Sequence, residues 1–144
     1  MKGIADTGFL VAFANRGDTN HEWAVAIAEH VDAPLLTCEA VLAEAGFHLQ
    51  DVGVVLAMVQ EGLVALSFAA EDHLPQLAAL ARRYGDRQPE LADLCLVRMS
   101  ELYPHHSVIT IDRDDFRVYR RNKREVLPLI CPPDRSSSHR GHLF

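Results

Sequence analysis

The sequence predicts an α/β fold in which a mainly parallel sheet is covered by helices on both faces. Short apolar runs with β character alternate along the chain with longer runs of helical periodicity, and this order is typical of parallel strands. The 144 residues are 49% apolar and 24% charged, which are ordinary values for one globular domain with its own core. The chain also contains no internal repeat.

The expected strands are short and apolar. They are residues 3–6, 34–37, 107–111 and, more weakly, 126–130. Pro128 restricts the last of these to the edge of the sheet, because proline donates no ladder hydrogen bond. Residues 62–68 fit either a further strand or the end of a helical hairpin.

The expected helices fill most of the chain between the strands. They span about residues 7–14, 20–32, 38–50, 52–60, 71–84 and 89–102. Asn20 is placed to cap the second of these helices and Thr37 to cap the third. Because the chain is rich in proline and serine from Pro132 onward, we expect one domain over residues 1–131 and a flexible tail over residues 132–144.

The composition of the chain argues against several classes of protein. The net charge of −6 argues against a protein that coats nucleic acid nonspecifically, although it allows a local basic patch. The three cysteines have no disulfide or metal-binding spacing, which indicates reduced thiols in a cytoplasmic protein. We expect no membrane segment, because every uncharged apolar run is shorter than the ~18 residues that cross a bilayer.

Four acidic residues occupy positions where an ionised group is costly unless something compensates its charge. Asp6 closes the first expected strand, and Asp112 directly follows SVITI. Glu44 and Asp93 are lone charges in apolar helical segments, and we expect the face that Glu44 shares with Phe47 to be shielded from solvent. Since parallel sheets bind ligands beyond the carboxyl ends of their strands, the four acids predict one shared site.

Each acid also has a simpler explanation. Asp6 either caps the helix that follows it or holds a cation, and Asp93 would suit a first helical turn in the same way. Asp112 would start a turn, and Glu44 would reach solvent along a helix edge. A shared site is more credible than four separate explanations. Converging carboxylates need a cation, and hard oxygen donors without a histidine or cysteine cluster indicate Mg²⁺ or Mn²⁺.

The segments ADTGFL, TCEAVLAEA, LADLCLVRMSE and ITIDRDDFRVYR, in this order and spacing, resemble the PIN domain family. The resemblance is to the VapC-type toxins of bacterial toxin–antitoxin pairs, and it runs from about residue 3 to residue 131. It implies a three-layer α/β/α sandwich with metal-dependent endoribonuclease activity that hydrolyses RNA phosphodiester bonds. It also implies inhibition by a small VapB-like antitoxin and, together with the apolar first 60 residues, a homodimer.

The resemblance assigns roles to the acids. The implied catalytic residues are Asp6, Glu44, Asp93 and Asp112. Asp6, Asp93 and Asp112 would be the main ligands of Mg²⁺ or Mn²⁺, and Thr7 would support Asp6. Glu44 would hold a water or help to position the nucleophile. Since DRDDF has one more acid than the shorter DRDF form, Asp114 or Asp115 would be able to share the role of Asp112.

A concentrated basic patch follows Asp112, with six basic residues in twelve positions. We expect its arginines to bind RNA phosphates on either side of the scissile bond. These are Arg113, Arg117, Arg120 and Arg121. The alternative is an exposed basic loop without a ligand. Phe116 and Tyr119 alternate with the arginines, and we expect them to anchor the segment to the core rather than to stack on bases.

Two rival functions remain open. One is a PIN-like domain that binds a partner without cleaving RNA, which loss of one of the acids would favour. The other is a phosphatase-like α/β enzyme that transfers phosphoryl groups. Such an enzyme would usually place a second acid two residues after its nucleophilic aspartate, where this chain has Gly8.

Overall fold

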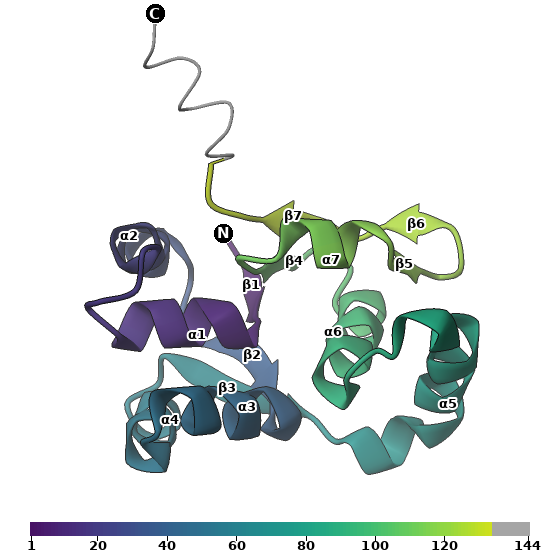
Figure 1. Ribbon diagram of the computed structural model, residues 1–144, viewed down its shortest axis with the longest axis horizontal. Coiled ribbons are helices and arrows are strands. Elements are labelled where there is room, and N and C mark those ends of the chain that lie inside the picture. Colours follow the sequence, from purple (N-terminus) through teal and green to yellow (C-terminus); the bar gives the residue numbers. More distant parts are fainter. Residues whose placement is uncertain (134–144) are drawn as a thin grey trace, which may run out of the picture.

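The computed structural model describes residues 1–133, which surround a parallel five-stranded sheet. Its strands are β1 (Gly3–Ala5), β2 (Leu35–Cys38), β3 (Val64–Phe68), β4 (Ser107–Ile109) and β7 (Leu129–Ile130). They lie in the order β3–β2–β1–β4–β7 (Figure 1), and every pair is parallel. The parallel sheet, the strand within residues 62–68 and the weak edge strand near Pro128 are therefore confirmed.

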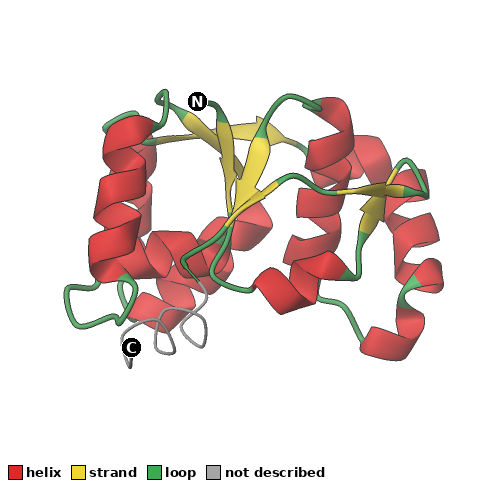
Figure 2. Cartoon of the chain, turned by 90° about the horizontal axis from the view of Figure 1, so that it is seen from above, coloured by secondary structure: helices red, strands yellow, loops and turns green. Residues whose placement is uncertain are grey.

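Helices cover both faces of this sheet, which gives the expected three layers (Figure 2). One group contains α1 (Thr7–Ala14), α2 (His21–His30), α3 (Glu39–Leu49) and α4 (Val52–Gln60). The other contains α5 (Leu74–Arg83) and α6 (Leu91–Leu102), with 3₁₀ turns at Ala70–His73 and Gly85–Arg87. Right-handed crossovers explain this division, because the chain moves outward from β1 to β3 and then returns across the sheet to β4.

Close packing of α1 against the end of β4 depends on a small residue at position 8. A Cβ atom added to Gly8 would lie 2.5 Å from the side chain of Ile111, so any larger residue would push the two segments apart. On the other side of α1, Phe9 is fully buried and meets the ring of Trp23 edge-on. These contacts fix the helix that starts at Asp6.

Two local expectations, for Thr37 and for the face of Phe47, were wrong, and the expected N-cap position of Asn20 is confirmed. Thr37 does not cap a helix: it is fully buried within β2 and donates a hydrogen bond to the carbonyl oxygen of Ala5, and Cys38 holds the N-cap position of α3 instead. Asn20 occupies the N-cap position of α2, but its side chain makes no capping bond. Phe47 is 79% exposed, so the outer face of α3 is open to solvent rather than shielded.

The segment after β4 has structure that the sequence pattern did not predict. It forms the short helix α7 (Arg113–Arg117) and an antiparallel hairpin of β5 (Arg120–Arg121) and β6 (Glu125–Val126). Asn122 and Lys123 turn this hairpin with positive φ angles of 49° and 71°. Phe116 and Tyr119 are buried, as expected for anchors to the core.

Arg121 is buried in this hairpin, and the expectation that it binds RNA is wrong. Its guanidinium donates to the carbonyl oxygens of Ser100 and Pro104 and forms an ion pair with Glu125 at 2.9 Å. Since these partners occupy the guanidinium, Arg121 joins the hairpin to α6.

The remaining expectations concern the chain as a whole. No helix among residues 1–133 has the length and apolar character needed to cross a membrane. Of the predicted tail, residues 134–144 lie outside the described residues, and Pro132 and Pro133 follow β7.

Candidate active site

Asp6 is both a helix cap and a member of the acidic site. It is the N-cap of α1, and its carboxylate accepts a hydrogen bond from the backbone N–H of Thr7 at 2.7 Å. The side chain is only 5% exposed, at the point where β1 ends, and the Asp6 backbone N–H donates to Ile109 of the neighbouring strand. Asp6 therefore caps α1, as the simpler explanation predicted, and it also lies at the carboxyl end of the sheet, as a shared acidic site requires.

Thr110 links Asp6 to Asp112. Its buried hydroxyl donates to Oδ2 of Asp6 at 2.6 Å and accepts a hydrogen bond from the backbone N–H of Asp112 at 3.0 Å. Since Thr110 directly follows β4, its hydroxyl links the end of that strand to Asp6, which directly follows β1. One side chain thus positions two of the four predicted acids.

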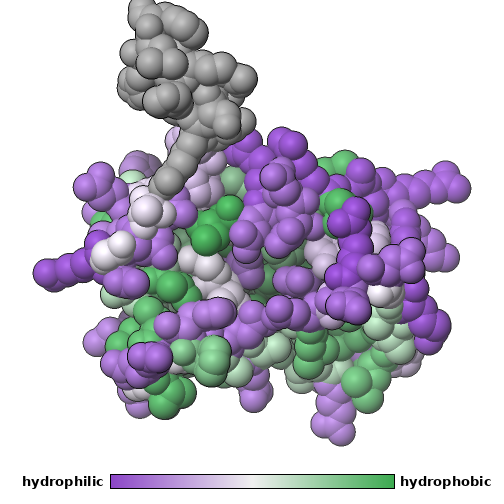
Figure 3. Space-filling model, viewed as in Figure 1, coloured by the Kyte–Doolittle hydropathy of each residue, from purple (hydrophilic) through white to green (hydrophobic). Residues whose placement is uncertain are grey.

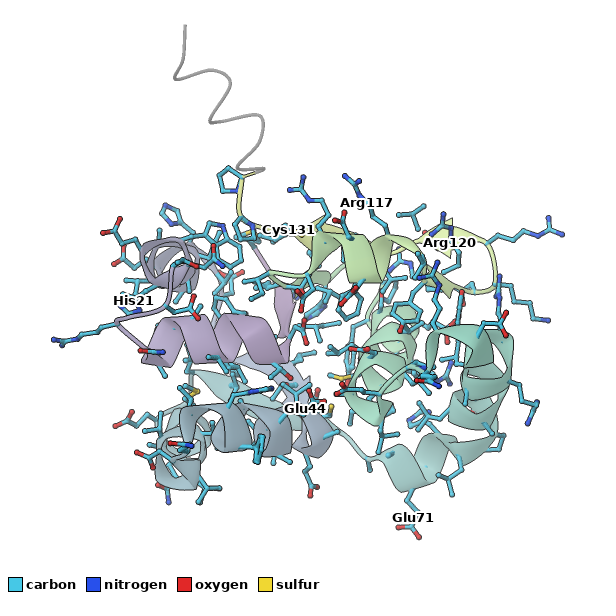
Figure 4. All side chains as sticks on the ribbon, viewed as in Figure 1. His21, Glu44, Glu71, Arg117, Arg120 and Cys131 are labelled. Atoms are coloured by element: carbon cyan, nitrogen blue, oxygen red, sulfur yellow. The ribbon has the colours of Figure 1, made fainter. Side chains whose placement is uncertain are left out.

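The four predicted acids line one cleft of about 490 Å³ beyond the carboxyl ends of β1 and β4. Asp6 directly follows β1, Glu44 comes from α3, and Asp93 comes from the first turn of α6. Because β4 ends at Ile109 rather than at the expected residue 111, Asp112 lies three residues beyond the strand, at the N-cap of α7. Figure 4 places Glu44 between the two groups of helices. We call this space the acid cleft.

Burial and mutual repulsion raise the pKa values of these acids. Burial raises the pKa of Asp6 to about 6, against the lowering effect of the hydrogen bonds from Thr110 and Thr7. Burial and the charge of Glu90 raise the pKa of Asp93 to about 6 and that of Glu44 to about 7. The pKa of Asp112 is also raised, by burial and then by a neighbouring carboxylate. Such a site favours a cation, because a cation stabilises all of the ionised forms together.

The donor chemistry of the cleft fits a hard divalent cation. All four predicted acids offer carboxylate oxygens, and these are the ligands that Mg²⁺ and Mn²⁺ prefer. The carboxylates surround the cleft rather than meet at one point: among residues 1–133, no three acidic, histidine or cysteine side chains are close enough to hold one ion as placed. Binding would therefore draw the carboxylates inward.

The predicted basic residues divide into different groups. Arg113 and Arg117 line a second hollow of about 460 Å³, which shares Asp112 and Asp115 with the acid cleft. The guanidinium of Arg120 instead donates to backbone carbonyls at the end of α7. Hydrophilic side chains gather over α7 and the hairpin (Figure 3).

Sequence reasoning missed two residues of the site and left a third undecided. Thr110 and Glu90 were missed, and Glu90 lines the acid cleft, where burial and then the charge of Glu90 raise the pKa of Glu44. The signal for Glu90 was its position three residues before Asp93 and directly before the helix, which puts both acids at the N-terminal end of α6. Of the two extra acids after Asp112, Asp115 lines the cleft, whereas the Asp114 side chain is 95% exposed.

Comparisons with known proteins agree with this geometry. No curated protein matches the sequence. The model of the PIN domain family matches residues 4–122, a span that runs from β1 through the acid cleft to the hairpin. The chain therefore belongs to the PIN domain family, whose members are generally nucleases.

Proposed function

We propose that the protein is a Mg²⁺- or Mn²⁺-dependent endoribonuclease that hydrolyses RNA phosphodiester bonds with water. The observation that carries this proposal is the acid cleft. Carboxylates beyond two strand ends and on two helices line it, and their pKa values are raised in the absence of a cation. Such an arrangement is costly to folding, so a function that needs a cation explains it better than packing does.

Asp6, Asp93 and Asp112 would hold the ion. When bound, Mg²⁺ or Mn²⁺ neutralises the carboxylates and stabilises the charge that develops on phosphoryl oxygens. The carboxylate of Asp6 accepts one hydrogen bond from the backbone N–H of Thr7 and another from the hydroxyl of Thr110, and these two bonds orient it.

Glu44 would orient the attacking water and take up its proton. The Glu44 side chain lies in the same cleft as the three proposed ligands, where its carboxylate is able to accept a hydrogen bond and then a proton from a water beside them. Arg113 and Arg117, in the adjoining hollow, would bind a phosphate of the RNA strand.

We further propose that the nuclease is the toxin of a type II toxin–antitoxin pair, that it forms a homodimer, and that a small VapB-like antitoxin covers its acids. The helical hairpin of α3 and α4 supports a protein contact, because it exposes Phe47, Val52 and Leu56 to solvent at 79%, 62% and 52%. Figure 3 shows apolar side chains on this part of the surface. We assign this face to a second copy of the chain.

The rival functions have less support. A domain that only binds partners would not need to maintain four acids that repel one another in a cleft. A phosphatase-like enzyme would need an acid near position 8, where the close approach of Ile111 permits only glycine.

Cleavage of a single-stranded RNA by the purified protein tests the proposal. We expect cleavage with Mg²⁺ or Mn²⁺, none with chelator, and none by the Asp93→Asn variant, whereas Asp72→Asn should cleave normally because Asp72 is exposed and lines neither the acid cleft nor the hollow of Arg113. Water as nucleophile leaves no 2′,3′-cyclic phosphate, which separates this activity from contaminating ribonucleases that use the 2′-hydroxyl. Cleavage that persists in chelator would contradict the proposal.

The toxin role has its own test. Expression of the intact gene without a partner should stop growth, and expression of the Asp93→Asn variant should not. Harmless expression of a cleavage-competent protein would contradict the toxin role and leave the nuclease function standing.

A further inference from the structure

A third hollow opens beside the acid cleft, on the side away from Arg113. It has a volume of about 230 Å³, and its lining includes Arg87, Gln88 and Tyr119. We call it the Arg87 hollow. Arg87 ends the short 3₁₀ turn that precedes α6, and no pattern in the sequence marks it.

The three hollows form one continuous trough. The Arg87 hollow shares Glu90 and Asp93 with the acid cleft, and the hollow of Arg113 shares Asp112 with it on the other side. Asp115 lines all three, so it marks the place where they meet. Carboxylates therefore line every part of the trough, and the two parts beside the acid cleft also contain arginines.

Arg87 is available to bind an anion. It shares its hollow with Glu90, Asp93 and Asp115, yet no ion pair joins it to a carboxylate anywhere in residues 1–133. Asp93 is a proposed ligand of the cation, so a bound cation would offset part of the negative charge of this hollow and leave the guanidinium of Arg87 to bind an anionic ligand. A guanidinium binds phosphate through paired N–H groups, which suits an RNA backbone.

The hollow also contacts the proposed metal site directly. Tyr119 lines it, and the hydroxyl of Tyr119 donates to Oδ2 of Asp93 at 3.5 Å. Asp93 itself also lines the hollow, so a phosphate beside Arg87 would lie next to the carboxylate that we assign to the cation. Such a position, beside the acid cleft rather than in it, suits a neighbouring phosphate of the same strand rather than the one that is cleaved.

We propose that the Arg87 hollow binds the RNA phosphate next to the scissile one, on the opposite side from the phosphate bound by Arg113 and Arg117. This inference rests on the proposed nuclease function and adds a substrate contact to it. Arg87 is a substrate-binding residue here and takes no part in the chemical step. The RNA backbone would then run the length of the trough, with the scissile phosphate over the acid cleft.

The matched substitutions are Arg87→Gln and Arg82→Gln. Arg82 is an exposed arginine in the last turn of α5 that lines none of the three hollows, so its loss removes the same charge from outside the trough. For a short single-stranded RNA, we expect Arg87→Gln to raise KM roughly three- to tenfold with kcat nearly unchanged. Arg82→Gln should change neither constant, and Arg87→Lys should recover part of the loss.

Neutral methylphosphonate linkages, placed one at a time along the RNA, locate the contact without relying on a variant. At one position beside the cleavage site, the methylphosphonate should weaken wild-type binding but have little further effect on Arg87→Gln. The dependence of binding on salt should also fall by about 0.7 in logarithmic slope for Arg87→Gln, which is the value for one phosphate contact on a single strand.

The outcomes separate this inference from the nuclease function. If the protein cleaves RNA with metal but Arg87→Gln matches Arg82→Gln, the Arg87 contact is wrong and the nuclease stands. If every methylphosphonate position affects wild type and Arg87→Gln equally, the contact is also wrong. If metal produces no cleavage at all, the nuclease function fails, and the inference fails with it.

Discussion

Replacing Asp6 with asparagine should stabilise the metal-free protein while it abolishes cleavage. Burial raises the pKa of Asp6 from 3.8 to about 6. Between these values the folded protein binds more protons than the unfolded chain, so the free energy of unfolding falls as pH rises through this window. A shift of about two units corresponds to about 3 kcal/mol above pH 7, where the buried carboxylate is fully ionised.

Asparagine removes this cost but loses part of the hydrogen bonding. Its side-chain oxygen is able to keep the bond from the N–H of Thr7, whereas the Thr110 hydroxyl loses the second oxygen to which it donates, at about 1 kcal/mol for a neutral hydrogen bond. We therefore expect a net gain of about 1–2 kcal/mol at about pH 7.5, or roughly 3–8 °C in melting temperature for a domain of this size.

Thermal melting in chelator, at about pH 4 and about pH 7.5, measures this gain. The gain should nearly vanish at the lower pH, because Asp6 is then protonated in the folded wild type. Asp114→Asn, on an exposed side chain, is the matched control and should change little at either pH. A loss of stability at the higher pH, or an equal gain at both, would refute the reasoning about repulsion and burial.

Three further substitutions test other parts of the structure. Thr110→Val should lower cleavage roughly tenfold or more, whereas Thr110→Ser keeps the hydroxyl and most of the activity. Arg121→Gln should lower the free energy of unfolding, measured by urea titration, by about 3 kcal/mol, because it removes the buried hydrogen bonds of the guanidinium. Arg124→Gln, at an exposed position, is the control; an equal effect of the two substitutions would show that the buried bonds of Arg121 contribute little to stability. Phe47→Asp should convert a dimer to monomer by light scattering, and Val126→Asp, on the exposed hairpin, should not.

The sequence was most informative where apolar periodicity is long or buried. The helix at residues 52–60 has its predicted bounds, and the first strand is one residue shorter than expected, because both segments are apolar along nearly all of their length. The acid cleft followed from a general property of parallel sheets, since carboxyl ends of neighbouring strands meet at one edge.

Features set by tertiary contacts were not predictable in this way. Arg121 has the same local pattern as its basic neighbours, and only the packing of the hairpin against α6 buries it. Phe47 is apolar, yet its position on the outer side of α3 exposes it. The role of Thr110 depends on the pairing of two strands, β1 and β4, that are far apart in sequence. Arg87 lines the trough because its 3₁₀ turn directly precedes α6, and no local sequence pattern marks this position.

Binding of Mn²⁺, measured by titration calorimetry at neutral pH, tests most directly whether the acid cleft is a cation site. The wild-type protein should bind Mn²⁺ saturably and release protons, because several of its carboxylates have raised pKa values. Asp93→Asn should weaken this binding at least tenfold, and Asp72→Asn, on an exposed side chain outside the trough, should bind as the wild type does. Equal binding by all three proteins, or no saturable binding by the wild type, would contradict the account.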